Sequence, residues 1–408
     1  MMQSMEFRSL LRSVQEHISK YYAVALTDTD KLRQLKPYIE KYLRDHDYSV
    51  DDPDGRKLID RLYDEMAGYS VLTPYLNDQT IEEINLNSWD DLSLTYTDGR
   101  IVKADEHFHS QQHAVDIVKR LLHSCSMIID NSTPMAQGHL PPVVCDSGMT
   151  INTRVTALKE PLVDAERGIS VSIRLLHPQT ITLNELTKQG TATKEMIDFL
   201  CLCLRYGVSF VIPGATSSGK TTLLNALLVS VPDQKRIFTI ESGSRELSLV
   251  RKDENERIVN NVVHTLSRPS DNPAYDISQE DLVMASLRFN PDIVCVGEMR
   301  DTECYAAVEA SLTGHTVVST VHSGGADAAH MRIALLCQKR FPIDFDTSLV
   351  QAAQAFPLIV YCHQLEDNSR KIMDISECVL SSKGERSYRS LYNFNIIQNT
   401  LDHGKYVI

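Results

Sequence analysis

Residues Val208 to Leu228 have the sequence VSFVIPGATSSGKTTLLNALL, which predicts a strand, a tight loop and a helix. The β-branched and aromatic residues before Pro213 favour a short buried strand, and the leucines that follow recur at helical spacing. The loop between them matches the P-loop pattern, in which backbone N–H groups and a helix N-terminus surround the phosphates of a nucleotide. We therefore expect a nucleotide site made of Gly214, Ala215, Thr216, Ser217, Ser218, Gly219, Lys220, Thr221 and Thr222.

Two side chains of this loop have predicted roles. Lys220 is expected to reach the outer phosphates, and the hydroxyl of Thr221 is expected to bind Mg²⁺. The alternative is a Gly/Ser-rich turn without a ligand. The buried strand before the loop and the amphipathic helix predicted after it are the context that the nucleotide site requires, so they favour that site.

Composition limits the classes of protein that fit. The 408 residues are enough for two or three domains, and the formal net charge of −13 argues against a mainly nucleic-acid-binding surface. The nine cysteines are scattered without paired CxxC units, which favours reduced thiols in a cytosolic protein over a zinc site or a disulfide framework. No run approaches the ~18 apolar residues of a membrane span, so we expect membrane association to be peripheral or through a partner.

The first part of the chain is predicted to be a helical extension, residues 1–75. The loop Asp51–Gly55 separates the last two of its helices. Apolar residues fall on one helical face in three places: Leu10, Leu11, Val14 and Ile18; Leu32, Leu35, Ile39 and Leu43; Leu58, Ile59, Leu62 and Met66.

Residues 76–176 are predicted to form a separate, smaller α+β domain. Three short strands begin at Ile81 and are followed by a helix over Gln111–Ser124. A Pro-rich loop is predicted over Pro134–Pro142, before two further strands at Ile151–Leu158 and Ile169–Leu175. Mixed strands with one helix favour an α+β arrangement.

Residues 177–192 are predicted to be a linker, and residues 193–408 a second domain. This domain opens with a helix over Thr193–Tyr206, before the P-loop. Strands then alternate with helical or loop stretches, which predicts an α/β domain with a parallel sheet covered by helices, the RecA-like form of P-loop domain. The predicted strands are Arg236–Glu241, Ile293–Glu298, Thr316–His322 and Leu358–Gln364.

Acids at strand ends are candidates for orienting water or holding Mg²⁺ beside the phosphates. Glu298 ends a buried strand, at the sheet edge where open α/β sheets bind ligands, although it could instead be an exposed strand-end carboxylate. Glu241 is a second strand-end acid, with Glu246 five residues later, and either could be solvated. His322 ends the next predicted strand and His315 begins it, and two such histidines are more often core or surface groups than catalytic ones. His322 should nevertheless emerge at the same edge, where an imidazole could sense the γ-phosphate.

Four motifs resemble, in order, those of the secretion ATPases, the hexameric motors of type II secretion, type IV pili and type IV secretion. They are GATSSGKTT at the P-loop, TIESGSREL as an acidic box, NPDIVCVGEMRD as an atypical Walker B strand ending in Gly-Glu, and GHTVVSTVHS as a histidine box. The resemblance covers most of residues 68–380. It implies a cytoplasmic ATPase that uses ATP and Mg²⁺ and works as a homo-hexamer on an inner-membrane platform protein. From the net charge of −13 we expect no stable nucleic-acid binding.

Within that superfamily the chain is most similar to the tight-adherence (Tad) pilus-assembly ATPases. The similarity lies in GYSVLTPYLNDQTIEEINLN at Gly68–Asn87 and in DNSTPM, RVTALKEP and VSIRLL further on. It implies that Arg154 and Arg174 reach the nucleotide from the N-terminal domain, whereas by themselves they would be read as surface ion-pair residues. It also implies a motor for pilus assembly or secretion.

Two departures from the family pattern keep other functions open. Ser217 stands where the family usually has Gly, which narrows backbone freedom. Ser242 replaces the usual Asp of the acidic box, and Glu246 lies one residue further from Glu241 than usual. The alternatives are a type IV secretion traffic ATPase for protein or DNA, and a nucleotide-gated scaffold that barely turns ATP over.

Overall fold

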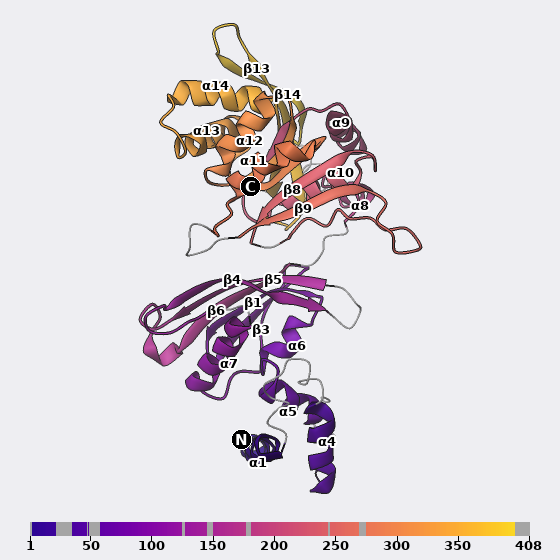
Figure 1. Ribbon diagram of the computed structural model, residues 1–408. Helices are drawn as coiled ribbons and strands as arrows, with labels where there is room; N and C mark the ends of the chain where they lie inside the picture. Colours follow the sequence, from indigo (N-terminus) through magenta and orange to yellow (C-terminus); the bar gives the residue numbers. More distant parts are fainter. Residues whose placement is uncertain are drawn as a thin grey trace. The chain divides into compact units, whose positions relative to one another are not determined.

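The computed structural model describes residues 2–21, 35–46, 48, 58–124, 127–144, 150–176, 181–243, 245–268 and 275–395. The chain divides into two compact units, Met1–His177 and Pro178–Ile408 (Figure 1). Leu32 and the loop Asp51–Gly55 lie outside the described residues. No helix among the described residues is long and apolar enough to cross a membrane.

Three helices at the start of the first unit share one small core. They are α1 (Met2–Tyr21), α4 (Leu35–Asp45) and α5 (Leu58–Met66). Val14, Ile18, Ile39, Leu43 and Leu62 are fully buried where they meet, so the helical spacing of these residues correctly predicted which face points inward.

The rest of the first unit is an antiparallel sheet with the strand order β3-β2-β1-β6-β5-β4. The helices α6 (Leu72–Leu76) and α7 (Gln111–His123) pack on its apolar face, where Val118 and Leu122 are fully buried. The strands are β1 (Ile81–Ser88), β2 (Asp91–Tyr96), β3 (Ile101–Lys103), β4 (Met135–Val144), β5 (Thr150–Lys159) and β6 (Ile169–Leu176).

The loop predicted over Pro134–Pro142 is wrong, because β4 occupies most of it. β4 pairs with β5 in register Met135↔Leu158, and the pairing shifts between Leu140 and Val143, where the two prolines lie. Only one side of β4 is paired, since it is the last strand of the sheet. Proline lacks a backbone donor and is tolerated on such an edge, so the prolines mark an edge strand rather than a loop.

The second unit is built on an eight-stranded sheet with the order β14-β13-β12-β7-β11-β10-β8-β9. The six strands from β12 to β9 are parallel, and β13 and β14 are added antiparallel at one edge. The strands are β7 (Phe210–Pro213), β8 (Arg236–Ser242), β9 (Asn261–Ser267), β10 (Ile293–Met299), β11 (Thr316–Val321), β12 (Leu358–Gln364), β13 (Arg370–Leu380) and β14 (Arg386–Asn393).

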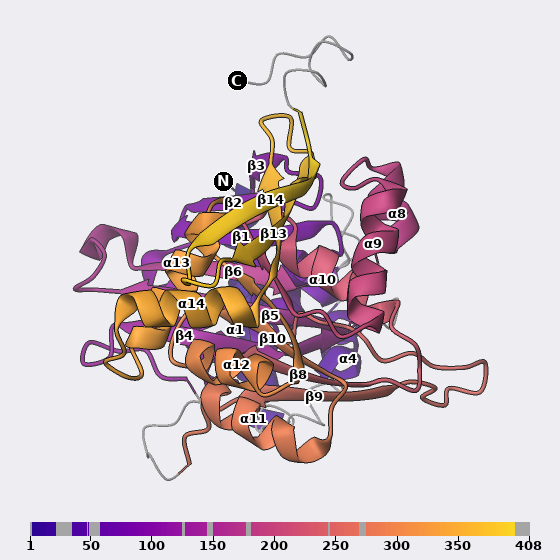
Figure 2. The same ribbon diagram turned by 90° about the horizontal axis from the view of Figure 1, so that it is seen from above.

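Helices cover both faces of this sheet, which is the predicted RecA-like arrangement (Figure 2). One face packs against α8 (Leu183–Lys188), α9 (Lys194–Arg205) and α10 (Lys220–Val229). The other packs against α11 (Gln279–Ser286), α12 (Glu303–Leu312), α13 (Gly325–Gln338) and α14 (Phe345–Ala355).

Two local expectations for this unit differ from the structure. The segment predicted as a linker contains α8, whose Leu186 is buried in the core, and Thr182 begins the helix with a capping box to Glu185. The helix after the P-loop is not amphipathic, because α10 lies between the sheet and α8 and α9 and even its polar Asn225 is buried. Asn225 is satisfied there by accepting a hydrogen bond from the Ser248 N–H at 2.8 Å.

A chain of polar contacts that starts at a buried histidine ties α13 to β14. His330 is fully buried, and its Nε2 lies 2.9 Å from the carbonyl oxygen of Phe356, which only a protonated nitrogen can bond. Its Nδ1 therefore accepts from the hydroxyl of Tyr388 at 2.9 Å. That hydroxyl accepts in turn from Arg386 at 2.7 Å, and Arg386 pairs with Asp327 at 2.9 Å.

Candidate nucleotide-binding site

Four neighbouring parallel strands end at one edge of the second sheet, and each carries a predicted site residue there. In the order β7-β11-β10-β8, the strand ends lead to the P-loop, His322, Glu298 and Glu241. The backbone N–H of Gly214 donates to the carbonyl of Val321 at 3.2 Å, so the P-loop begins directly beside the end of β11. The structure thus brings these residues together at the edge where α/β sheets bind ligands.

The P-loop backbone requires glycine at its start. A Cβ on Gly214 would overlap the carbonyl oxygen of Cys362 and the hydroxyl of Ser218. Ala215, Thr216 and Ser217 form the exposed apex of the loop.

Gly219 then begins α10 with a φ of +87°, in the left-handed region that glycine tolerates best. Thr221 and Thr222 follow in the first turn and are half-buried. The positive end of α10 therefore faces the loop, which favours an anion there.

Lys220 is folded into the loop. Its side chain is buried, and Nζ donates to the carbonyl oxygen of Ala215 at 2.6 Å. Burial lowers the pKa of Lys220, and the opposing charges of Glu298 and Glu246 limit that effect. The ammonium is therefore held at the carbonyl of Ala215, where the charge of Glu298 acts on it.

Glu298 and His322 form a pair across β10 and β11. Oε1 of Glu298 lies 3.0 Å from Nε2 of His322, and Oε2 lies 3.8 Å from Nε of Arg300. Burial, followed by repulsion from Lys220, lowers the pKa of His322, while Glu298 acts in the opposite direction. Both side chains stay partly exposed, so a phosphate could contact either of them. His315 lies at the opposite end of β11 and does not join this group.

Glu241 is the most buried acid of the site. Its side chain lies beside Gly297 of β10, and Oε1 accepts hydrogen bonds from the backbone N–H groups of Glu246 at 2.7 Å and Leu247 at 3.0 Å. Oε2 has no hydrogen-bond partner among the described residues. Burial raises the pKa of Glu241 to about 7, so the group can hold or release a proton near neutral pH.

The residues at this edge suit Mg²⁺, which prefers oxygen ligands and keeps several waters. The Thr221 hydroxyl and the Glu298 carboxylate are the protein oxygens predicted to hold it, and the charge of Glu298 acts on the adjacent Lys220. Bound there, the ion would neutralise charge on the phosphate oxygens.

Arg154 and Arg174 lie in the first unit, side by side in register on β5 and β6. Arg174 pairs with Glu82 at 3.2 Å, and both side chains are about one-third exposed. Arg154 is half-buried and helps to lower the pKa of His139, after the larger effect of burial. The two guanidinium groups therefore share one part of the sheet, and their predicted role toward nucleotide stays a prediction.

One residue at the P-loop was not predicted. Arg370, at the start of β13, donates from Nε to the carbonyl oxygen of Ser217 at 2.9 Å. It lies 153 residues after Ser217 in the chain and in no recognised motif, so nothing in the sequence links it to the loop.

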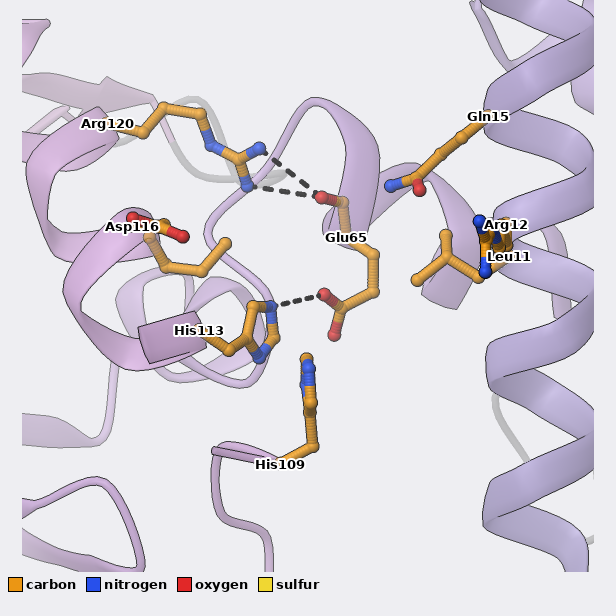
Figure 3. A pocket seen from close by; sticks show the side chains of 9 residues that line it. Leu11, Arg12, Gln15, Glu65, His109, His113, Asp116 and Arg120 are labelled. Carbon is orange, nitrogen blue, oxygen red and sulfur yellow. Dashed lines mark hydrogen bonds and ion pairs between the residues drawn. The ribbon is translucent and has the colours of Figure 1, made fainter. Parts of the chain in front are cut away.

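A cavity of about 550 Å³ lies in the first unit between α1, α5 and α7 (Figure 3). Two of its lining side chains bond to neighbouring elements: Glu65 lies 3.0 Å from His113 Nε2, and Arg120 donates to the carbonyls of Glu65, Met66 and Gly68. These bonds attach the end of α5 to α7. We assign the cavity a structural role.

Comparison with known proteins identifies a family. The sequence profile described as "Type II/IV secretion system protein" matches residues 65–403. The type IV secretion system protein PtlH of Bordetella pertussis is 31% identical over 184 residues, which are 44% of this chain and 52% of PtlH. An uncharacterized protein of Methanocaldococcus jannaschii is 27% identical over 259 residues, which are 64% of this chain and 44% of that protein. The matches thus span about half the length of these relatives.

Solved structures show the same fold. The X-ray structure of the ATPase DotB of Legionella pneumophila has a TM-score of 0.52 at 20% identity and covers 81% of both chains. DotB of Yersinia pseudotuberculosis has a TM-score of 0.50 at 16% identity, over 82% of this chain and 81% of that one. At this identity the likeness concerns the fold alone.

Proposed function

This chain belongs to the type II/IV secretion system protein family, and we propose that it hydrolyses ATP with Mg²⁺. The observation that carries the proposal is the meeting of Lys220, Glu298 and His322 at one sheet edge, with Glu298 Oε1 3.0 Å from His322 Nε2. A buried ammonium beside a partly exposed carboxylate suits phosphoryl transfer, which depends on positioning and charge stabilisation.

Each group has a proposed part in hydrolysis. Lys220 and the loop N–H groups hold the phosphates. Glu298 orients the attacking water, and its partner His322 responds to the γ-phosphate. Glu241 accepts a proton, which its pKa of about 7 permits at neutral pH.

The proposed assembly is a homo-hexameric ring in which Arg154 and Arg174 stabilise the transition state at a neighbouring subunit's phosphates. A closed ring allows each site to be completed by the next copy. Nucleotide binding and hydrolysis would then change the arrangement of the domains and give a mechanical stroke.

We further propose that this stroke acts on an inner-membrane platform of a Tad or type IV pilus-like system. The chain would be cytoplasmic and peripheral at that membrane. The motif likeness at Gly68–Asn87 supports the pilus assignment.

The second candidate is a traffic ATPase of type IV secretion that moves protein or DNA. The 31% identity to PtlH, a type IV secretion system protein, favours it. Co-purification separates the two: a pilus motor should retain a platform protein, whereas a traffic ATPase should retain other components of a type IV secretion system.

Lys220→Ala tests the ATPase itself. Removing the buried ammonium should abolish turnover and weaken ATP binding, because the remaining donors are uncharged backbone groups. Calorimetry and phosphate release measure the two effects. Turnover at the wild-type rate in the variant would refute the nucleotide site, and wild-type protein that binds Mg·ATP without releasing phosphate would favour a nucleotide-gated scaffold.

A further inference from the structure

The side chain of Arg370 contacts the P-loop at two points. Its Nε donates to the carbonyl oxygen of Ser217 at 2.9 Å. Its aliphatic part lies against Gly219, where an added Cβ would come 3.1 Å from Arg370 Cδ. One side chain therefore contacts the loop through both a polar and an apolar part.

The residue that Arg370 contacts has an unfavourable backbone conformation. Ser217 has a φ of +63°, in the left-handed region. That region disfavours a residue with a Cβ by roughly tenfold relative to glycine. The loop apex therefore gains from any group that holds Ser217 in this conformation.

The hydrogen bond from Arg370 fixes the direction of the next N–H group. In a trans peptide the carbonyl of Ser217 and the N–H of Ser218 point in opposite directions. Because Arg370 bonds that carbonyl, the N–H of Ser218 points to the opposite side of the peptide, where it donates within the loop to the carbonyl oxygen of Ala215 at 3.4 Å. Inward N–H groups are the donors that a P-loop offers to phosphate.

We propose that Arg370 is a positioning residue that holds the left-handed Ser217 peptide so that the Ser218 N–H faces the nucleotide phosphates. This inference rests on the proposed ATPase function and names a further residue of the same site. It differs from a direct charge contact between Arg370 and phosphate, which would require the guanidinium charge but not the Nε hydrogen bond.

Two substitutions separate these roles. Arg370→Met keeps an unbranched stem against Gly219 and has no donor. Arg370→Gln also removes the charge but places an N–H donor at the same position along the side chain as the arginine Nε. Arg389→Met is a matched control, since Arg389 lies on β14 and pairs with Glu377 on the exposed surface.

The measurements are ADP and ATP affinity by calorimetry, and KM and kcat from phosphate release. Arg370→Met should weaken the binding of ADP and ATP and raise KM by about tenfold, with kcat nearly unchanged. The reason is that the Ser218 N–H is no longer held toward the phosphates, in the ground state and the transition state alike. The nucleotide affinity and KM of Arg370→Gln should stay within about threefold of the wild-type values. Arg389→Met should have no effect.

Ser217→Gly provides an independent test. Glycine adopts the left-handed conformation without help, so Arg370→Met should cost less than about threefold in affinity when combined with Ser217→Gly. This comparison remains informative if Arg370→Met also lowers the melting temperature, because the double variant is compared with Ser217→Gly alone.

The proposal is overturned if Arg370→Met and Arg370→Gln lose affinity equally, or if the loss is the same with and without Ser217→Gly. The first result assigns Arg370 to direct charge contact, and the second shows that Arg370 does not act through the conformation of Ser217. Wild-type affinity in Arg370→Met also overturns it. If wild-type protein binds neither nucleotide, or Lys220→Ala binds them as tightly as wild type, the ATPase proposal itself fails.

Discussion

The pH dependence of phosphate release tests the proton-accepting role of Glu241. Burial raises its pKa to about 7, against an ordinary value of 4.5, and only its ionised form can accept a proton. About one-tenth of such a group is ionised at pH ~6 and about nine-tenths at pH ~8. With Mg·ATP saturating, kcat should therefore rise about tenfold over this interval.

The effect of Glu241 on protein stability cannot produce that rise. The folded-state pKa of Glu241 lies above its ordinary value, so the folded protein binds the proton more tightly than the unfolded chain does. The contribution of Glu241 to stability is therefore greatest below pH 4.5 and is lost as pH rises toward about 7. Activity is expected to increase while this contribution declines, and melting curves at each pH would show the two trends.

Two variants make the assignment specific. Glu241→Gln should remove the pH-dependent rise and lower kcat by at least ~10²-fold. The charge of Glu246 helps to raise the pKa of Glu241, while its backbone N–H bonds Oε1. Glu246→Gln removes that charge and keeps the N–H, so the midpoint should move to lower pH. A flat wild-type profile, or an unmoved midpoint in Glu246→Gln, would refute the reasoning.

Four further substitutions have defined outcomes. Glu298→Gln should keep ATP bound and slow hydrolysis by at least ~10²-fold, since the amide cannot polarise water as a carboxylate does; loss of affinity instead would make Glu298 mainly a Mg²⁺ ligand. Arg154→Ala and Arg174→Ala should each leave ATP affinity largely intact and reduce phosphate release, and wild-type turnover in both would make them structural residues. Rings that mix Arg154→Ala subunits with Lys220→Ala subunits should regain part of the phosphate release if the arginine acts across a subunit boundary. Burial acts to raise the pKa of Glu65, but hydrogen bonds from His113 and Ser70 outweigh this effect, so the pKa is lowered. The contribution of Glu65 to folding stability should therefore be present above pH 4.5 and be lost as pH falls below that value. Glu65→Gln should cost about 1–3 kcal/mol of unfolding free energy at neutral pH, read from urea denaturation, and an unchanged midpoint would contradict a stabilising role.

The fold was predictable where side-chain periodicity is strong. The spacing of apolar residues located α4 and α7, and the mostly β-branched run before Glu298 located β10. The strand at Asn261–Ser267 was not predicted, since it is an edge strand of mixed polarity with little inward-facing apolar surface. The strand β4 was also not predicted, because its prolines suggested a loop. An edge strand tolerates proline, since it does not need every backbone donor.

The site was predictable only in its local parts. Strand-end positions placed Glu241, Glu298 and His322 at one edge, because parallel strands end together. Sequence could not show that Glu241 is buried enough to titrate near neutrality, since that depends on packing beside Gly297. It also could not associate Arg370 with the P-loop, because their contact depends on how β13 is added to the sheet.

The hairpin of β13 and β14 decides where a working fragment of this chain can be cut. A chain ending after β12 would lack Arg370, would leave His330 Nδ1 without the Tyr388 hydroxyl, and would expose the whole open edge of β12 to pairing with other chains. The hairpin therefore cannot be trimmed away as a surface appendage. Expression clones designed for nucleotide assays should extend at least through Asn393.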